Sequence, residues 1–350
     1  MAICGSLNWK RIWRLILACV WLALPARAAY VNGHSYLPLA DWAGANHFAL
    51  MRNSRGDVFT VSSRSARLIF DKDSNIVELN GVKVAMAFPL AVDRGTPLVS
   101  QLDLAKTLSP LIHPSRSTAN HVTTICLDPG HGGKDTGNHV GSHYEKIYTL
   151  ALALELRDEL RAAGFQVMLT RSQDEYVDLA ERPNLANRRG ADLFVSLHFN
   201  AAPTDASHVN GPETYCITPV GASSSNAQGE GANHGAAPAN RVESKSLALA
   251  YQVQRSLVKN LDAEDRNVRR ARFAVLRYAE MPAILIESGY MTHPVEGRRI
   301  FDAGYRRQIA AAIVKGILNY QKLTSPAPRA TMVAETKASN PNKTKLRTRP

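Results

Sequence analysis

The chain has 350 residues, of which 45% are hydrophobic and 21% are charged, and its formal net charge is +12. This composition lies in the range of ordinary globular proteins and excludes a fold that depends on disulfides, because the apolar residues suffice for a core. The length allows about two domains, and the basic excess favours contact with a polyanionic wall or membrane surface over contact with nucleic acid.

Residues 1–28 have the pattern of a secretory signal. Basic residues precede the apolar run LILACVWLAL, and Ala26 and Ala28 then supply the small residues of a cleavage site. The run is too short to span a bilayer, which requires about 20 residues. We therefore expect this signal peptide to be removed and the protein to be secreted or periplasmic, without stable insertion in a membrane.

Residues 30–112 are predicted to form a small β-rich module. Apolar and polar residues alternate in RGDVFTV and in ARLIFDKDSNIVELNGVKVAMAFPLAV, which contains an Asn-Gly turn signal, and SQLDLAKTLSPLI is typical of a short helix. The module carries no obvious chemistry, and three roles stay open: binding of wall polymers, targeting, or contact with a partner such as an activator. Residues 113–121 are expected to form a linker.

From residue 122 to residue 322 the pattern changes to alternating strands and helices. The apolar runs are TTICLD, FQVMLTR, ADLFVSLHF, ETYCITP, FAVLR and AILIESG, and the helical segments are KIYTLALALELRDELRAAG, SLALAYQVQRSLVKNL and YRRQIAAAIVKGILNYQ. Strands that are apolar throughout predict an α/β sheet covered on both faces. The tail, residues 323–350, carries six basic residues and one acidic residue, and we expect it to be disordered.

Two cysteines, Cys126 and Cys216, remain once the signal segment is removed, and both lie in strand-like runs. The oxidising compartment permits a disulfide between them. Two buried thiols are the interpretation that we favour.

Chemistry-bearing side chains follow three of the predicted strands. His131 stands in the glycine-rich PGHGG after ICLD, His198 follows LFVSL, and Glu287 follows AILI. Because ligands bind beyond the carboxyl ends of strands in α/β sheets, these side chains meet if the strands are parallel and adjacent. Glu145, where the first long helix begins, is a fourth candidate. The glycines beside His131 are expected to let a substrate backbone approach closely.

Two imidazoles and one carboxylate, with a further position open to water, are the donors of a catalytic zinc site. A second carboxylate would then carry the proton from the attacking water to the leaving amine. The residues alone leave open whether Glu145 or Glu287 is the ligand. They also leave open whether Asn200 and Arg182 position substrate or hold loops, and His139 and His143 lie near the site in sequence without such a placement.

Several blocks in order resemble the zinc-dependent N-acetylmuramoyl-L-alanine amidases known as the amidase 3 family. They include LDPGHGGKDTGN, YEK, LAERPNLANRRGADLFVSLHFNA and AILIESGYMTHP, within about residues 123–320. The resemblance implies that His131, Glu145 and His198 bind one Zn²⁺ ion and that Glu287 is the catalytic glutamate.

The implied fold is a mostly parallel twisted sheet of about six strands flanked by helices. The implied substrate is peptidoglycan, cut between the lactyl group of N-acetylmuramic acid and L-alanine. A different secreted zinc peptidase of wall peptides and an inactive peptidoglycan-binding module are the alternatives.

Two features depart from the family pattern. The sequence ESGYMTHP stands where members often have Glu-Gly-Gly-Phe followed by Ser-Asn, which affects residues beside the expected catalytic Glu287. Some members also carry an inhibitory helix over the zinc, in the region that follows ETYCITP here. Residues 221–240 lack the apolar spacing of such a helix, so we expect no autoinhibition of this kind.

Overall fold

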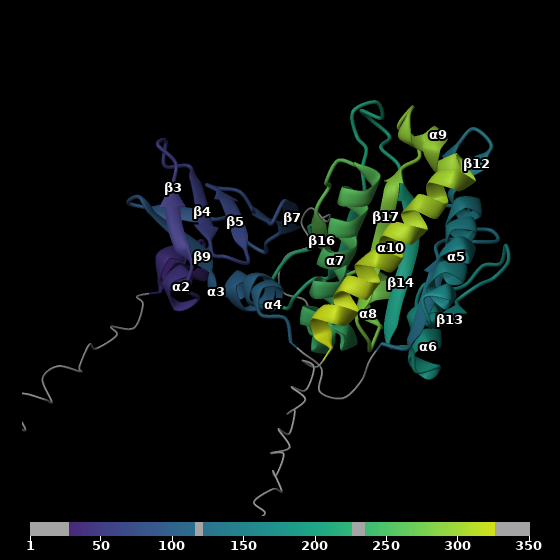
Figure 1. Ribbon diagram of the computed structural model, residues 1–350, viewed down its shortest axis with the longest axis horizontal. Helices are drawn as coiled ribbons and strands as arrows, with labels where there is room; N and C mark the ends of the chain where they lie inside the picture. The colour runs from purple at the N-terminus through teal and green to yellow at the C-terminus, as the bar shows by residue number, and fades with distance from the viewer. Residues whose placement is uncertain (1–27, 116–121, 226–234, 326–350) are drawn as a thin grey trace, which may run out of the picture.

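The computed structural model describes residues 28–115, 122–225 and 235–325 (Figure 1). Nearly all of the expected signal segment lies outside these ranges, as do residues 116–121 of the expected linker and residues 326–350 of the expected tail. Within the described ranges, no helix combines the length and the apolar character that crossing a bilayer requires.

The N-terminal part is built from short strands joined by tight turns. Its strands are β1 (Ala29–Val31), β2 (His34–Pro38), β3 (Ala49–Arg52), β4 (Val58–Ser62), β5 (Arg67–Asp71), β6 (Ile76–Leu79), β7 (Val82–Ala85), β8 (Ala91–Asp93) and β9 (Thr96–Ser100). The predicted Asn-Gly turn joins β6 to β7, where Asn80 and Gly81 have φ values of 49° and 81°. Positive φ at both central residues is what a type I′ hairpin turn requires.

The helices of this part are α2 (Leu39–Ala45), α3 (Gln101–Asp103), the π-helical turn η1 (Leu104–Leu108) and α4 (Ser109–Ile112). The last three form the short helical segment that was expected, and the sequence analysis did not identify α2.

The second part contains the longer elements. Its strands are β10 (Thr124–Pro129), β11 (His139–Val140), β12 (His143–Tyr144), β13 (Gln166–Leu169), β14 (Leu193–Asn200), β15 (Glu213–Ile217), β16 (Val268–Ala271) and β17 (Ala283–Tyr290). Its helices are α5 (Glu145–Ala162), α6 (Glu181–Arg188), η2 (Pro238–Val242), α7 (Glu243–Leu261), α8 (Ala274–Arg277), α9 (Glu296–Phe301) and α10 (Ala303–Thr324).

The main sheet is mixed and has eleven strands in the order β13-β10-β14-β17-β15-β16-β7-β6-β5-β4-β3. The predicted α/β class is confirmed, but the expected sheet of about six mostly parallel strands is not. Two causes account for the difference. A loop without a crossover helix joins β14 to β15, so β15 runs antiparallel to β17. Strand β7 then pairs with β16 and adds the antiparallel hairpins of the N-terminal part.

One apolar run forms a helix instead of a strand. Residues Ala274–Arg277 of FAVLR form α8, while the preceding segment, with the sequence VRRA, forms β16. Because β16 has arginines at its two central positions, its sequence lacks the apolar pattern that predicts a strand. It nevertheless lies inside the sheet, between β15 and β7.

Helices cover both faces of the sheet, and Figure 1 shows α5, α7 and α10 side by side over one of them. Along β14, Leu193, Val195 and Leu197 join the large core under these helices, whereas Phe194 joins a smaller core with residues of α6 and α8. Since side chains alternate along a strand, His198 points to the same face as Phe194. By the same rule Glu287 points to the face of Leu285, which also belongs to the smaller core.

Candidate active site

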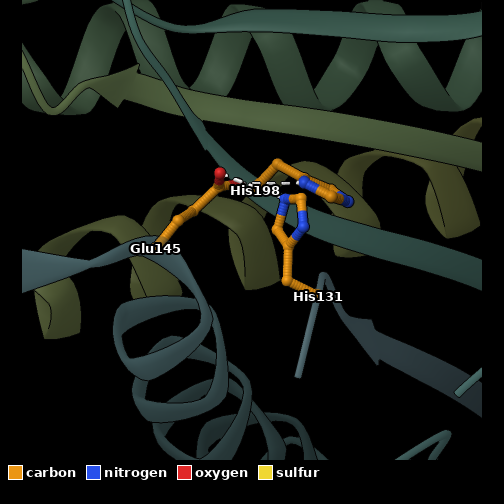
Figure 2. A group of neighbouring side chains, drawn as sticks. All are labelled: His131, Glu145 and His198. Carbon is orange, nitrogen blue, oxygen red and sulfur yellow. Dashed lines mark hydrogen bonds and ion pairs between the residues drawn. The ribbon is translucent and has the colours of Figure 1, made fainter. Parts of the chain in front are cut away.

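Three of the predicted side chains form one cluster at the carboxyl ends of the central strands. Figure 2 shows the rings of His131 and His198 with the carboxylate of Glu145 directed at both. His131 Nε2 lies 3.1 Å from Glu145 Oε2, and His198 Nδ1 lies 3.0 Å from Glu145 Oε1. One potential ligand atom from each residue lies within 4.8 Å of the others.

The loop after β10 presents His131 in a left-handed backbone conformation. Its φ is 63°, and Gly132 follows with a φ of 125°. His131 Nδ1 lies 2.9 Å from Asp135 Oδ2, so one ring nitrogen faces Asp135 and the other faces Glu145. A carboxylate partner of this kind fixes the orientation of an imidazole and increases its basicity as a ligand.

Two buried arginines hold the carbonyl oxygens of this loop. Arg182 donates to the oxygens of Pro129 and His131, at 2.8 and 2.9 Å, and Arg171 donates to the oxygen of Gly130 at 2.8 Å. Arg182 also pairs with the fully buried Asp128 at 2.9 Å. The structure therefore gives Arg182 the loop-holding role, one of the two alternatives that the sequence left open.

Glycines near the cluster make room for its side chains. A Cβ on Gly130 would lie 2.2 Å from Cε1 of His198, and a Cβ on Gly137 would lie 2.6 Å from both Glu145 Oε2 and His131 Cδ2. Such distances are far inside van der Waals contact. The absence of a side chain at these positions thus serves the packing of the cluster. That the glycines beside His131 also let a substrate backbone approach stays a prediction.

Glu145 is the first residue of α5 and is almost completely buried. Its carboxylate accepts hydrogen bonds from the backbone N–H groups of Asn138, at 2.9 Å, and Phe199, at 3.1 Å. Burial alone would raise the pKa of Glu145, but hydrogen bonds with His131 and His198 outweigh it and hold the pKa well below its usual range. The carboxylate is therefore ionised and fixed in place.

Glu287 lies on β17 beside His198, its partner on β14 in the sheet register. Its Oε2 is buried and has no hydrogen-bond partner among the described residues. Burial raises the pKa of the Glu287 carboxyl, and the negative charges of Glu145 and Glu213 raise it further. With His131, Glu145 and His198 it lines a cavity of about 310 Å³.

Further residues line this cavity from the side of the smaller core. They are Asn138, Leu179, Phe273, Ala274, Val275 and Leu285. The cavity thus combines one polar wall with one apolar wall, as ligand sites usually do.

The donors of the cluster fit a zinc ion. Two imidazole nitrogens and a carboxylate oxygen converge, and neutral imidazole with carboxylate suits Zn²⁺ without thiolates. Asp135 and Asn138 supply the outer hydrogen bonds that would orient His131 and Glu145 as metal ligands. Glu287 lies in the same cavity, and neither His131 nor His198 is paired with its carboxylate.

Other candidates lie apart from the cluster. Asn200 donates to buried Glu213 at 2.7 Å and so takes a structural position. The ring of His143 stacks on Phe301, with the ring centroids 3.9 Å apart, and His139 is exposed. The sequence analysis missed Asp135, Asn138 and Glu213, although the first two lie in the quoted block LDPGHGGKDTGN.

The two cysteines are free and buried, which confirms the favoured interpretation. Cys126 belongs to the smaller core and Cys216 to the larger one, so they lie on opposite faces of the sheet. Burial raises the pKa of the Cys126 thiol to about 12, and its chemistry is correspondingly that of an inert core residue.

The profile of the Amidase_3 family, described as N-acetylmuramoyl-L-alanine amidase, matches residues 125–319. This is more than half of the chain. The chain belongs to the N-acetylmuramoyl-L-alanine amidase family. The resemblance seen in the sequence blocks is thereby confirmed.

Relatives named as N-acetylmuramoyl-L-alanine amidases match more than half of the chain. The amidase LytC of Bacillus subtilis is 35% identical over 199 residues, which are 57% of this chain and 36% of LytC. The chain thus spans about a third of the length of that relative. The amidase AmiA of Escherichia coli is 31% identical over 246 residues, which are 63% of this chain and 84% of AmiA.

Among solved structures, the amidase AmiC2 of Nostoc punctiforme is 33% identical, with a TM-score of 0.48. The match covers 58% of this chain and 99% of AmiC2.

Proposed function

We propose that this protein is a zinc-dependent amidase of peptidoglycan, which cuts the amide bond between the lactyl group of N-acetylmuramic acid and L-alanine. The observation that carries the proposal is the convergence of His131, Glu145 and His198 in one cavity with Glu287. Membership of the amidase family supports the choice of bond.

In this proposal His131 Nε2, His198 Nδ1 and the Glu145 carboxylate hold one Zn²⁺ ion. A zinc ion bound there would act as a Lewis acid and lower the pKa of a water to about 7. The low pKa of the Glu145 carboxyl keeps it available as an anionic ligand, and Asp135 holds the His131 ring in position.

Glu287 acts as the general base and acid. It accepts a proton from the attacking water as the new C–O bond forms, and it returns the proton to the nitrogen of L-alanine as the C–N bond breaks. The raised pKa of Glu287 suits this exchange, because a carboxyl with a pKa nearer to neutrality both accepts and donates a proton efficiently. The apolar wall of the cavity limits the access of bulk water to this carboxyl.

Mass spectrometry of digested sacculi tests the proposed bond. We expect peptides with a free L-alanine amino terminus and glycan chains whose muramic acid residues remain intact. Peptides cut at internal bonds would instead support a different zinc peptidase, and binding without any product would support an inactive peptidoglycan-binding module. Either result would contradict the proposal.

The place of action and the remaining segments belong to the same proposal. Export through the predicted signal, residues 1–28, would bring the protein to the wall, in the periplasm or outside the cell. The part formed by residues 30–112 would contact wall polymers, a targeting site or an activator. The residues ESGYMTHP, which begin with Glu287, would adjust the preference for particular muropeptides.

A further inference from the structure

A second hollow lies between helices α7 and α10, far in sequence from the cluster of ligands. It is a groove of about 470 Å³. Its lining comes from the two helices alone: Gln252, Arg255, Ser256, Lys259, Asn260, Lys315, Asn319, Lys322 and Leu323. In Figure 1 these helices cover one face of the sheet. By the alternation of side chains along β14 and β17, Glu287 and His198 point to the opposite face.

The groove is lined by four cations and by no acid. All four cations are exposed: Arg255, Lys259, Lys315 and Lys322. Within the described ranges, no ion pair is formed by Arg255, Lys259 or Lys322. Helix α10 contains no Asp or Glu. The one acid of α7 is Glu243, which is buried at the start of the helix and paired with Lys106 at 2.5 Å. Nothing on the two helices therefore neutralises the positive potential of the groove.

The floor of the groove is held by close packing of the helices. A Cβ on Gly316 would lie 2.7 Å from the Cα of Val253, so the backbones touch at this point. Ser256 donates to the carbonyl oxygen of Ala312 at 2.6 Å, and Lys315 Nζ donates to Asn260 Oδ1 at 2.9 Å. The backbone positions that carry the four cations are thus held in place by the packing of the two helices. This lowers the entropic cost of binding a ligand.

We propose that this groove binds a soluble polymer that carries phosphate groups along its chain. Lysine and arginine are the usual partners of phosphate oxygens, and the amides of Gln252 and Asn319 offer further donors in the same groove. A row of cations in a concave site concentrates such an anion and holds it more tightly at low salt. The site is separate from the catalytic cavity, so a bound polymer leaves that cavity open.

The chain itself offers no occupant of matching charge. Residues 326–350 carry six basic residues and one acidic residue, and residues 1–28 carry four basic residues and no acidic one. A second copy is equally unsuited, since the chain without residues 1–28 still carries 38 basic and 30 acidic residues.

Membranes and nucleic acids fit the groove less well than a phosphate polymer does. Leu318 is the only exposed large apolar side chain on α7 and α10, whereas a helix that docks on a bilayer presents an apolar face. No aromatic side chain is among the residues that line the groove, so nucleic-acid bases would find no stacking surface there.

A binding experiment with inorganic polyphosphate tests the proposal without any need for turnover, so its failure is distinct from failure of the proposed amidase activity. The groove variant combines Arg255→Gln, Lys259→Gln and Lys322→Gln. The control variant removes the same charge elsewhere, by Arg161→Gln, Arg189→Gln and Arg298→Gln at exposed positions that line neither the groove nor the catalytic cavity. Both variants keep the basic tail, and far-UV circular dichroism verifies that both are folded.

At low salt we expect the groove variant to bind polyphosphate at least about tenfold more weakly than the wild type, a difference of about 1.4 kcal/mol, while the control changes little. Equal weakening in both variants, or none in either, would overturn the proposal, because binding would then depend on net charge or on another site. Groove-dependent binding to phosphatidylglycerol vesicles without binding to polyphosphate would overturn it too, in favour of a membrane surface.

Discussion

At the scale of single residues, the cluster depends on nearby glycines, which carry no side chain, as much as on the side chains that form it. Gly130 carries no Cβ at the point where the ring of His198 passes, and Asp135 holds His131 from behind. The motif PGHGG therefore positions two histidines of the cluster, the one that it contains and the one on β14.

The substitution Gly130→Ala tests whether the lack of a Cβ at this position makes room for the His198 ring. The new methyl group would overlap the His198 ring, 2.2 Å from its Cε1, and the ring would have to move. We expect activity on peptidoglycan to fall about a hundredfold, since small displacements of catalytic groups have effects of that size. Turnover and zinc content are the measurements.

Gly44→Ala is the matched control, because no atom lies within 4 Å of a Cβ placed there. It should leave activity unchanged. Wild-type activity in Gly130→Ala would contradict the packing that we describe.

Three side chains of the cavity were predictable at this scale because they follow apolar strands. His131, His198 and Glu287 stand where a buried run ends, which is an unusual position for polar side chains. Asp135, Asn138 and Glu213 could not be predicted in the same way, since their partners come from the loop path and from the register of β15 against β17.

At the scale of elements, the segment between β15 and α7 is the part of the sequence in which an inhibitory helix would lie. No described residue of 218–242 lines the catalytic cavity, and residues 226–234 lie outside the described ranges. The absence of apolar spacing in residues 221–240 remains the basis of the expectation that no helix covers the site.

Replacement of residues 226–234 by a short glycine–serine linker tests that expectation. Activity should stay within about twofold of the wild type, because a segment that forms no inhibitory helix uncovers nothing when it is replaced. The rate of release of muropeptides from sacculi is the measurement. A large gain in rate would show that this segment restrains the enzyme and would contradict the expectation.

The sequence predicted helices and strands correctly where the apolar pattern was long. The prediction was wrong where tertiary contacts decide whether a segment forms a helix or a strand. Helices α5, α7 and α10 have sustained apolar periodicity and were predicted. Strand β16 carries Arg269 and Arg270, and it becomes a strand because Arg269 pairs with Glu213 at 2.8 Å and β15 and β7 flank it. No local pattern contains that information.

At the scale of the whole molecule, the N-terminal part and the amidase part share one sheet and one core. The large core includes Phe59 and Val77 from the first part together with Leu156 and Ile313 from the second. Across the junction, the hydroxyl of Tyr251 donates to the carbonyl oxygen of Leu79 at 2.9 Å. The sequence predicted a small β-rich module, residues 30–112, a linker and a catalytic domain, residues 122–322. It did not predict the pairing of β7 with β16, because no local pattern in either segment indicates it.

We therefore expect the two parts to unfold together. Trp42 is the only tryptophan beyond residue 28 and reports on the N-terminal part, whereas far-UV circular dichroism mainly reports on the long helices. In a chain without residues 1–28, both probes should give one thermal midpoint. Tyr251→Phe should lower both by the same amount, because the loss of one buried hydrogen bond costs about 0.5–1.5 kcal/mol.

Tyr30→Phe, at an exposed tyrosine, is the control and should leave the midpoint unchanged. Separate midpoints for the two probes in the wild type would refute the idea of a shared core.

The central claim, that His131, Glu145 and His198 hold one zinc ion while Glu287 transfers the proton, is tested most directly by measuring zinc content and turnover together in two variants. Glu287→Gln should keep about one zinc ion per chain, because its carboxylate is not a ligand, and should lose activity by at least about a hundredfold. His131→Ala should lose both zinc and activity. Full turnover in Glu287→Gln, or undiminished zinc in His131→Ala, would contradict the account.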